Sequence, residues 1–180
     1  LDPFNAKYHG FHAMTLVFNR RYDDALAAVQ ATFAIQPEQW VAGAAHQYVL
    51  LCEGRREEWL ADQRRLIAHD PELVAAFAEG LAGSGYEGAQ KAIAELLAAR
   101  REASGGFAPN SGWIALRYLD AGDHDRAIYW LERAYQDRDR NLPYITGPVW
   151  DPVRSDPRFQ DILRRMNLPP LPPQLENASN

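Results

Sequence analysis

Three histidines are the residues of this chain whose spacing comes nearest to a metal site. His9 and His12 stand three residues apart, on one face of a predicted helix, and His46 is a candidate third ligand from a neighbouring segment. A structural zinc site normally takes four closely held ligands, and the sequence has no Cys-x-x-Cys or His-Glu-x-x-His arrangement to supply them. We therefore interpret these histidines as surface or interface residues and predict no metal and no cofactor.

Cys52 is the single cysteine, and together with a histidine it could act as a thiol nucleophile. It ends the apolar run that begins at Tyr48, a position typical of a small core or binding-face residue, and buried structural cysteines are usually inert. A lone cysteine forms no intramolecular disulfide, which fits a reducing compartment, and the N-terminus shows no signal-peptide pattern. We expect a cytoplasmic location.

The remaining candidates for chemistry are carboxylate pairs and glycine-rich loops. Acidic and basic residues alternate, as in 53–58 and 136–140, which is typical of solvated helix faces. The glycines of 103–107 lack the Gly-Lys-Ser/Thr sequence that cradles phosphates. These patterns favour a protein that is not an enzyme.

Composition sets further limits on function. The chain has 180 residues, 47% hydrophobic and 24% charged, which is ordinary for a packed fold. A formal net charge of −5 gives no general attraction to nucleic acid or to anionic membranes, and no apolar run reaches the roughly 18 residues that cross a bilayer. The start at Leu1, without a methionine, predicts that the chain is part of a longer protein.

A fixed period organises the elements that would carry any site. Pro3, Pro37 and Pro71 stand 34 residues apart, and so do Leu16 and Leu50. Within each period apolar residues recur at spacings of three and four, which predicts helices, and a polar or glycine-containing turn divides the period in two. We expect helical hairpins over approximately 5–36, 39–70, 72–102 and 109–137.

Two of the hairpins are predicted to be irregular, and a terminal segment is predicted to cover the last one. Trp59 replaces the small residue expected where two helices approach, so the second hairpin should be splayed or locally rearranged to admit an indole. In the third, the turn at 83–86 comes early. An amphipathic segment within 150–167 should cap the last hairpin with Phe159, Ile162, Leu163 and Met166, before a proline-rich tail over 168–180.

These features resemble the tetratricopeptide repeat family. The resemblance rests on the period, on small residues that open second helices (Ala25, Ala89, Ala127), on turn glycines (Gly54, Gly85, Gly122) and on closing prolines. It implies an all-α fold: one repeat domain over 1–167, built as a right-handed solenoid of about four antiparallel hairpins with a C-terminal capping helix. The stretch 122–168 is similar to the end of repeat regions in bacterial multidomain signalling proteins, which follow a cyclase, kinase or winged-helix regulatory domain.

The family resemblance implies a protein or peptide partner, bound on the concave face that the first helices of the hairpins line. It implies no contact of this segment with nucleic acid or membrane. Carried over to this sequence, the binding residues are Lys7, Phe11, Met14, Phe18, Tyr48, Leu51, Trp113, Leu116 and Arg117.

Two alternatives stay open at this point. Imperfect packing around Trp59 could leave a pocket for a small hydrophobic ligand between hairpins, so that the region acts as a sensor. Exposed apolar faces could instead join two copies as a homodimer. Of the five tryptophans we expect most to be buried, with Trp113 as the exception.

Overall fold

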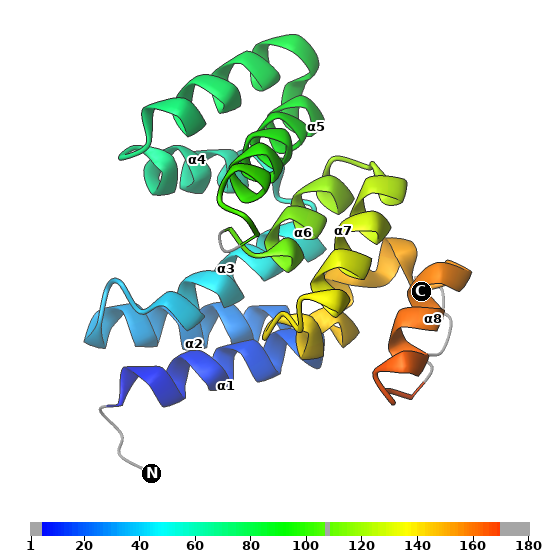
Figure 1. The fold of residues 1–180 in the computed structure, drawn as a ribbon. Coiled ribbons are helices and arrows are strands. Elements are labelled where there is room, and N and C mark those ends of the chain that lie inside the picture. The colour runs from blue at the N-terminus through cyan, green and yellow to red at the C-terminus, as the bar shows by residue number, and fades with distance from the viewer. Residues whose placement is uncertain (1–4, 107–108, 170–180) are drawn as a thin grey trace, which may run out of the picture. The chain divides into compact units, whose positions relative to one another are not determined.

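The computed structural model describes residues 5–106 and 109–169, and in these ranges the chain is all-helical, with no β-strand (Figure 1). It divides into two compact units, where the sequence predicted one repeat domain. The first unit comprises the residues up to Asp62 together with Gly147–Val149. The second comprises Gln63–Thr146 and the residues from Trp150 on. The predicted tail lies almost wholly outside the described residues.

Three helices build the first unit: α1 (Ala6–Phe18), α2 (Tyr22–Ile35) and α3 (Trp40–Cys52). Each of the three packs against the other two. Side-chain caps fix where two of them begin, since Asn5 Oδ1 accepts from two backbone N–H groups of α1 and Gln39 Oε1 accepts from Ala42 N at 2.7 Å. Their shared core is small and aliphatic: Ala13, Leu16, Val17, Ala25, Val29, Ala42, Ala45 and Val49.

Gly10 permits a close approach of α1 and α3. A Cβ at this position would lie 2.5 Å from Gln39 Oε1 and 3.1 Å from the Cβ of Val41. A side chain there would force Gln39 and Val41 to shift, so glycine allows the closest packing. The close contact fixes the N-terminal part of α3 against the first half of α1.

Helix α4 (Arg56–Ile67) crosses the boundary between the two units. Its first part, Arg56–Asp62, does not lie closely along α3 as α2 lies along α1, and it meets α3 through His46 Nδ1 and Asp62 Oδ2 at 2.8 Å. Trp59 is completely buried. This arrangement agrees with the expectation that the indole holds the second hairpin open.

Helix α5 (Pro71–Ala103) consists of two helical segments that meet at Ser84 and Gly85, whose backbone dihedrals are not helical. The break falls within the turn predicted at 83–86, and Gly85 has the positive φ of 65° that favours glycine. A Cβ on Gly80 or on Gly88 would collide with the carbonyl oxygen of the other. The two segments therefore cross in direct backbone contact.

An ion pair closes the open end of this hairpin. Arg100 Nη1 donates to Asp70 Oδ2 at 2.5 Å, and its Nη2 donates to Glu72 at 2.7 Å. Asp70 also caps α5 by accepting from Leu73 N. The Arg100 guanidinium holds the pKa of the Asp70 carboxyl well below its usual range.

The second unit continues with α6 (Ser111–Asp120) and α7 (His124–Gln136), which pack against each other, while α6 also packs against α5. Two short 3-10 helices follow, η1 (Leu142–Thr146) and η2 (Pro148–Val153), and then α8 (Pro157–Arg165). Helix α8 packs on α7 and buries the side chains of Phe159, Ile162 and Leu163, as predicted for the cap, whereas Met166 is half-buried.

Polar contacts fix the cap as well as apolar ones. Arg165 Nη1 donates to Glu132 of α7 at 2.9 Å, and its guanidinium lies 4.5 Å from the centre of the Tyr135 ring. Trp150 stacks on Phe159 at 6.4 Å between ring centres. Among the described residues, no helix combines the length and the apolar character needed to cross a membrane.

Candidate functional site

Six of the predicted binding residues lie in the first unit, on α1 and α3. Lys7, Phe11, Met14 and Phe18 follow one another at intervals of three and four residues, so they share one side of α1. Tyr48 and Leu51 stand on the neighbouring helix α3. We call these six residues the α1–α3 face.

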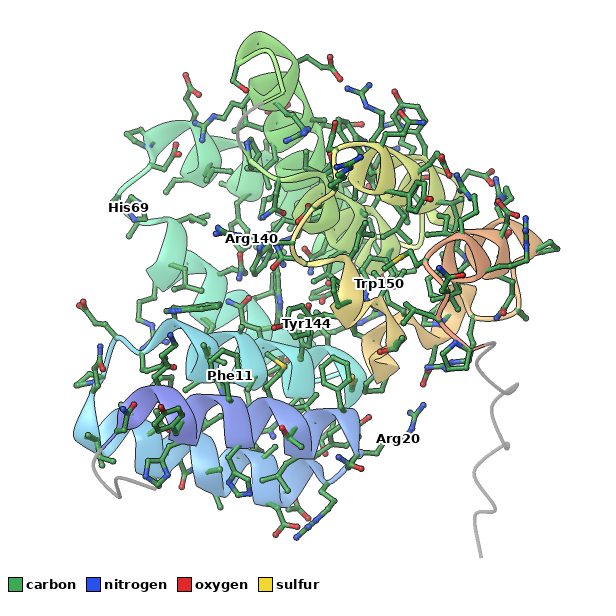
Figure 2. The ribbon with its side chains drawn as sticks, turned by 60° about the horizontal axis from the view of Figure 1, so that its bottom comes forward. Phe11, Arg20, His69, Arg140, Tyr144 and Trp150 are labelled. Atoms are coloured by element: carbon green, nitrogen blue, oxygen red, sulfur yellow. The ribbon has the colours of Figure 1, made fainter. Side chains whose placement is uncertain are left out.

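The apolar side chains of the α1–α3 face are only partly covered. Phe11 is 38% exposed and Lys7 is exposed, while Met14, Phe18, Tyr48 and Leu51 are half-buried. Met14 and Tyr48 pack against the same aliphatic core, from two different helices. The structure therefore brings residues of α1 and α3 together at one surface of one unit, with Phe11 beside α3 (Figure 2).

Trp40 is a further exposed aromatic residue on α3, and the sequence analysis missed it. Its side chain is 70% exposed, so the expectation that Trp40 belongs to the core is wrong. Part of the reason is local: Trp40 is the first residue of α3, and one turn further on the helix offers only Gly43 and Ala44 for an indole to pack on. This local signal is visible in the sequence, but whether another element covers the indole is not.

The other end of the α1–α3 pair holds Cys52 beside Tyr22. The pKa of the Tyr22 phenol is raised to about 12, mainly by burial and also by the hydrogen-bonded Cys52 thiol, whereas nearby Arg20 acts in the opposite direction. Figure 2 labels Arg20 at the turn that follows α1. The Tyr22 phenol thus lies next to the Cys52 thiol, which the sequence analysis weighed as a candidate nucleophile.

The three predicted residues of α6 belong to the second unit and differ in exposure. Trp113 is 36% exposed, in agreement with its expected exposure, but Leu116 and Arg117 are only 3% and 5% exposed. Their side chains offer no surface to a partner, so their placement on an open face is wrong. The cause is that α6 buries nearly its whole circumference, from Ile114 to Leu119.

Arg117 instead takes part in a buried polar network. Its Nη1 donates to Gln90 Oε1 at 3.3 Å, and its guanidinium lies 5.6 Å from the centre of the Trp113 ring. Gln90 Nε2 donates to the Tyr86 hydroxyl at 2.9 Å, and that hydroxyl donates to Asp120 Oδ2 at 2.5 Å. Buried polar groups satisfied in this way tie α5 to α6 and specify their register.

The histidines do not assemble a metal site in the part of the chain that the structure describes. Between residues 5 and 169, leaving out 107–108, no group of three or more His, Cys, Asp or Glu side chains is placed to hold a metal ion. His46 pairs with Asp62, and His12 is exposed on α1. Both observations agree with the interpretation of the histidines as surface or interface residues.

Comparisons of the chain with protein-family models, with curated proteins and with solved structures found no match. The resemblance to tetratricopeptide repeats accordingly stays a prediction from the sequence. The α1–α3 face is the candidate that the geometry favours.

Proposed function

We propose that the chain is a non-catalytic binding protein whose α1–α3 face docks a segment of another protein. One observation carries the proposal: two helices that pack against each other, α1 and α3, each keep a large apolar side chain exposed, Phe11 at 38% and Trp40 at 70%. Contiguous exposed apolar side chains mark interaction sites more often than single scattered ones do. Amphipathic segments recognise such faces by inserting side chains at regular intervals.

The energetic scale of this face fits a weak, transient complex. Burying one large apolar side chain contributes about 1.5–3 kcal/mol relative to leaving it exposed. Two or three such contacts contribute about 3–9 kcal/mol before the cost of association and ordering, which corresponds to affinities on the order of millimolar. A docking module of this kind needs no titratable cluster.

The proposal also includes the arrangement of the hairpins and the cellular role of the chain. The helical pairs would stack in sequence order as a right-handed tetratricopeptide-like solenoid. The chain would work in the cytoplasm as the interaction or sensor region of a larger bacterial signalling protein. The order of the helices along the chain and the covering helix α8 support the stacking; the cellular role rests on the sequence resemblance.

The test is selection of short random peptides on the immobilised chain, followed by affinity measurements for the selected peptides. We expect Phe11→Ala to weaken the selected peptides about tenfold, because it removes a large apolar contact at the face. Gln30→Ala, on the exposed side of α2, is the matched control and should change nothing. Selected peptides that bind Phe11→Ala and the wild type equally would show that the face is misassigned.

A further inference from the structure

Nearly all arginines of this chain are engaged by other groups of the chain. Among the residues that the structure describes, every arginine except Arg138 and Arg140 takes part in a hydrogen bond, an ion pair, a ring contact or another electrostatic interaction. These two are exposed and stand two residues apart in the segment 137–141, which joins α7 to η1 and in which Figure 2 labels Arg140. We call this segment the arginine turn.

The first carboxylate of the arginine turn, Asp137, is bonded to other elements. Its Oδ2 accepts from Arg101 Nη2 at 2.5 Å and from Ser111 Oγ at 3.1 Å. Arg101 is a buried residue of α5, so a guanidinium beneath the turn already compensates this carboxylate. Asp137 is therefore not the partner of the two exposed arginines.

The second carboxylate, Asp139, lies between the two arginines in sequence but is bonded to backbone groups. Its Oδ2 accepts from Gly112 N at 3.0 Å, and its Oδ1 accepts from Asn141 N at 2.9 Å. Both oxygens thus hold the turn against the start of α6. Neither is bonded to Arg138 or Arg140.

The carboxylates at the neighbouring ends of α5 and α7 have arginines of their own. Glu102 lies 3.5 Å from Arg133 Nη1, and Glu132 accepts from Arg165 Nη1 at 2.9 Å. The arginine turn therefore presents two cations against one carboxylate that no cation compensates. Its local charge is positive, on a chain whose formal net charge is −5.

Backbone hydrogen bonds fix the arginine turn at both ends. Arg138 has a φ of 54°, and its N–H donates to Tyr135 O at 3.2 Å. Asp139 N donates to Ala134 O at 2.9 Å, and Asp139 O accepts from Leu142 N at 3.1 Å. A ligand that binds the guanidinium groups has to order side chains only, because the backbone beneath them is already fixed.

We propose that Arg138 and Arg140 bind carboxylates of an acidic segment of a partner protein. Guanidinium groups match carboxylates through paired N–H···O bonds. The inference goes beyond the proposed function, because it concerns another surface, on the second unit, and a partner of defined charge. Nucleic acid is a poorer occupant, since its backbone is held by several clustered cations and the turn has two.

The test is fluorescence anisotropy of four labelled ligands with the whole chain. They are a peptide of alternating Glu and Ser, its analogue with Gln for Glu, a phosphoserine peptide of the same charge as the first, and a single-stranded oligonucleotide of that charge. The Glu peptide should bind more tightly than the Gln analogue, and salt should remove the difference. The chain as a whole is acidic, so its net charge cannot produce this preference.

Substitutions assign the preference to the arginine turn. Arg138→Asn combined with Arg140→Ser removes both cations, and asparagine tolerates the positive φ of the first position. This double variant should weaken the Glu peptide about three- to tenfold and leave the Gln analogue unchanged. The matched control, Arg21→Asn combined with Arg164→Ser, removes two exposed arginines that already have carboxylate partners, and it should have a much smaller effect.

Equal affinity for the Glu and Gln peptides, or equal weakening by the two double variants, would overturn the inference. Tighter binding of the phosphoserine peptide or of the oligonucleotide than of the Glu peptide would also overturn it, because the turn would then recognise phosphate. Phe11→Ala should leave the Glu peptide unaffected; a loss of binding would move the acidic segment to the α1–α3 face. A failed random-peptide selection together with the expected binding of the Glu peptide would reject the proposed function and keep this inference.

Discussion

At the scale of single residues, two tryptophans of the first unit define opposite environments. Trp59 is completely buried, whereas Trp40 is 70% exposed at the start of α3. Both residues occur at the N-terminal side of a helix, so their position along the helix does not distinguish them. What differs is whether another element covers the indole.

The two tryptophans should therefore differ in their effect on stability. We expect Trp40→Ala to change the free energy of unfolding by no more than about 0.5 kcal/mol, as for other exposed positions. Trp59→Ala should lower it by about 3–5 kcal/mol, because a large buried ring is removed. Denaturant titration followed by circular dichroism measures both. A milder variant, Trp59→Phe, keeps the comparison valid if the alanine variant does not fold.

Tyr22 gives a prediction at alkaline pH. Its pKa is raised from 10.0 to about 12 in the folded chain, chiefly by burial. The folded state thus keeps the phenol proton when the unfolded state has lost it. The resulting contribution to stability is complete below about pH 10 and disappears as the pH rises toward 12.

Tyr22→Phe should therefore flatten the loss of stability between about pH 10 and pH 12, relative to the wild type. Unfolding midpoints in denaturant, measured across this pH range, provide the test. Tyr144→Phe, the same change at an exposed tyrosine, is the control and should follow the wild-type curve. Identical pH curves for Tyr22→Phe and the wild type would contradict the role of burial at Tyr22.

At the scale of elements, α5 shows how one predicted hairpin acquires its geometry. The turn at Ser84 and Gly85 needs a positive φ, and the crossing of the two segments needs Gly80 and Gly88 without side chains. The ion pair of Arg100 with Asp70 then joins the two ends. Three separate features of the sequence thus agree on one compact hairpin.

Alanine substitutions along α5 should distinguish a steric clash at the crossing of its two segments from the general effect of replacing glycine in a helix. Gly80→Ala and Gly88→Ala should each destabilise the protein by about 1–3 kcal/mol or more, because the new methyl group meets a backbone carbonyl. Gly83→Ala is the matched control, since a Cβ there has no atom within 4 Å, and it should be neutral or slightly stabilising. Thermal unfolding of the three variants tests this; equal effects would show that the segments do not cross at the glycines.

At the scale of the whole molecule, each unit has buried aliphatic residues of its own. Val17 belongs to the core of α1, α2 and α3, and Leu131 is fully buried on α7 in the second unit. Units with separate cores can open separately, with different free energies.

Hydrogen exchange should resolve the two units. We expect Val17→Ala, which removes two methyl groups from the first core, to increase amide exchange mainly in α1, α2 and α3. Leu131→Ala should do so mainly in α6, α7 and α8. Mass spectrometry of peptic fragments provides the measurement. An equal increase along the whole chain in both variants would mean that the protein opens as one cooperative unit.

The sequence by itself determined the helices and most turns. The turn glycine at Gly85 and the apolar side of the cap at Phe159 depend on local spacing, and each has its counterpart in the structure. Even the irregular second hairpin could be inferred from Trp59, because an indole cannot occupy the place of an alanine. Patterns that repeat within one or two turns suffice for such predictions.

Only the tertiary structure decided which helix faces are covered. Periodicity gives Trp40 and Trp59, or Trp113 and Arg117, without saying which side chain meets solvent. It likewise did not reveal the pairing of Gln90 with Arg117, or the division of the chain into two units. Burial depends on which elements become neighbours in space, and helical spacing within one segment carries no information about that.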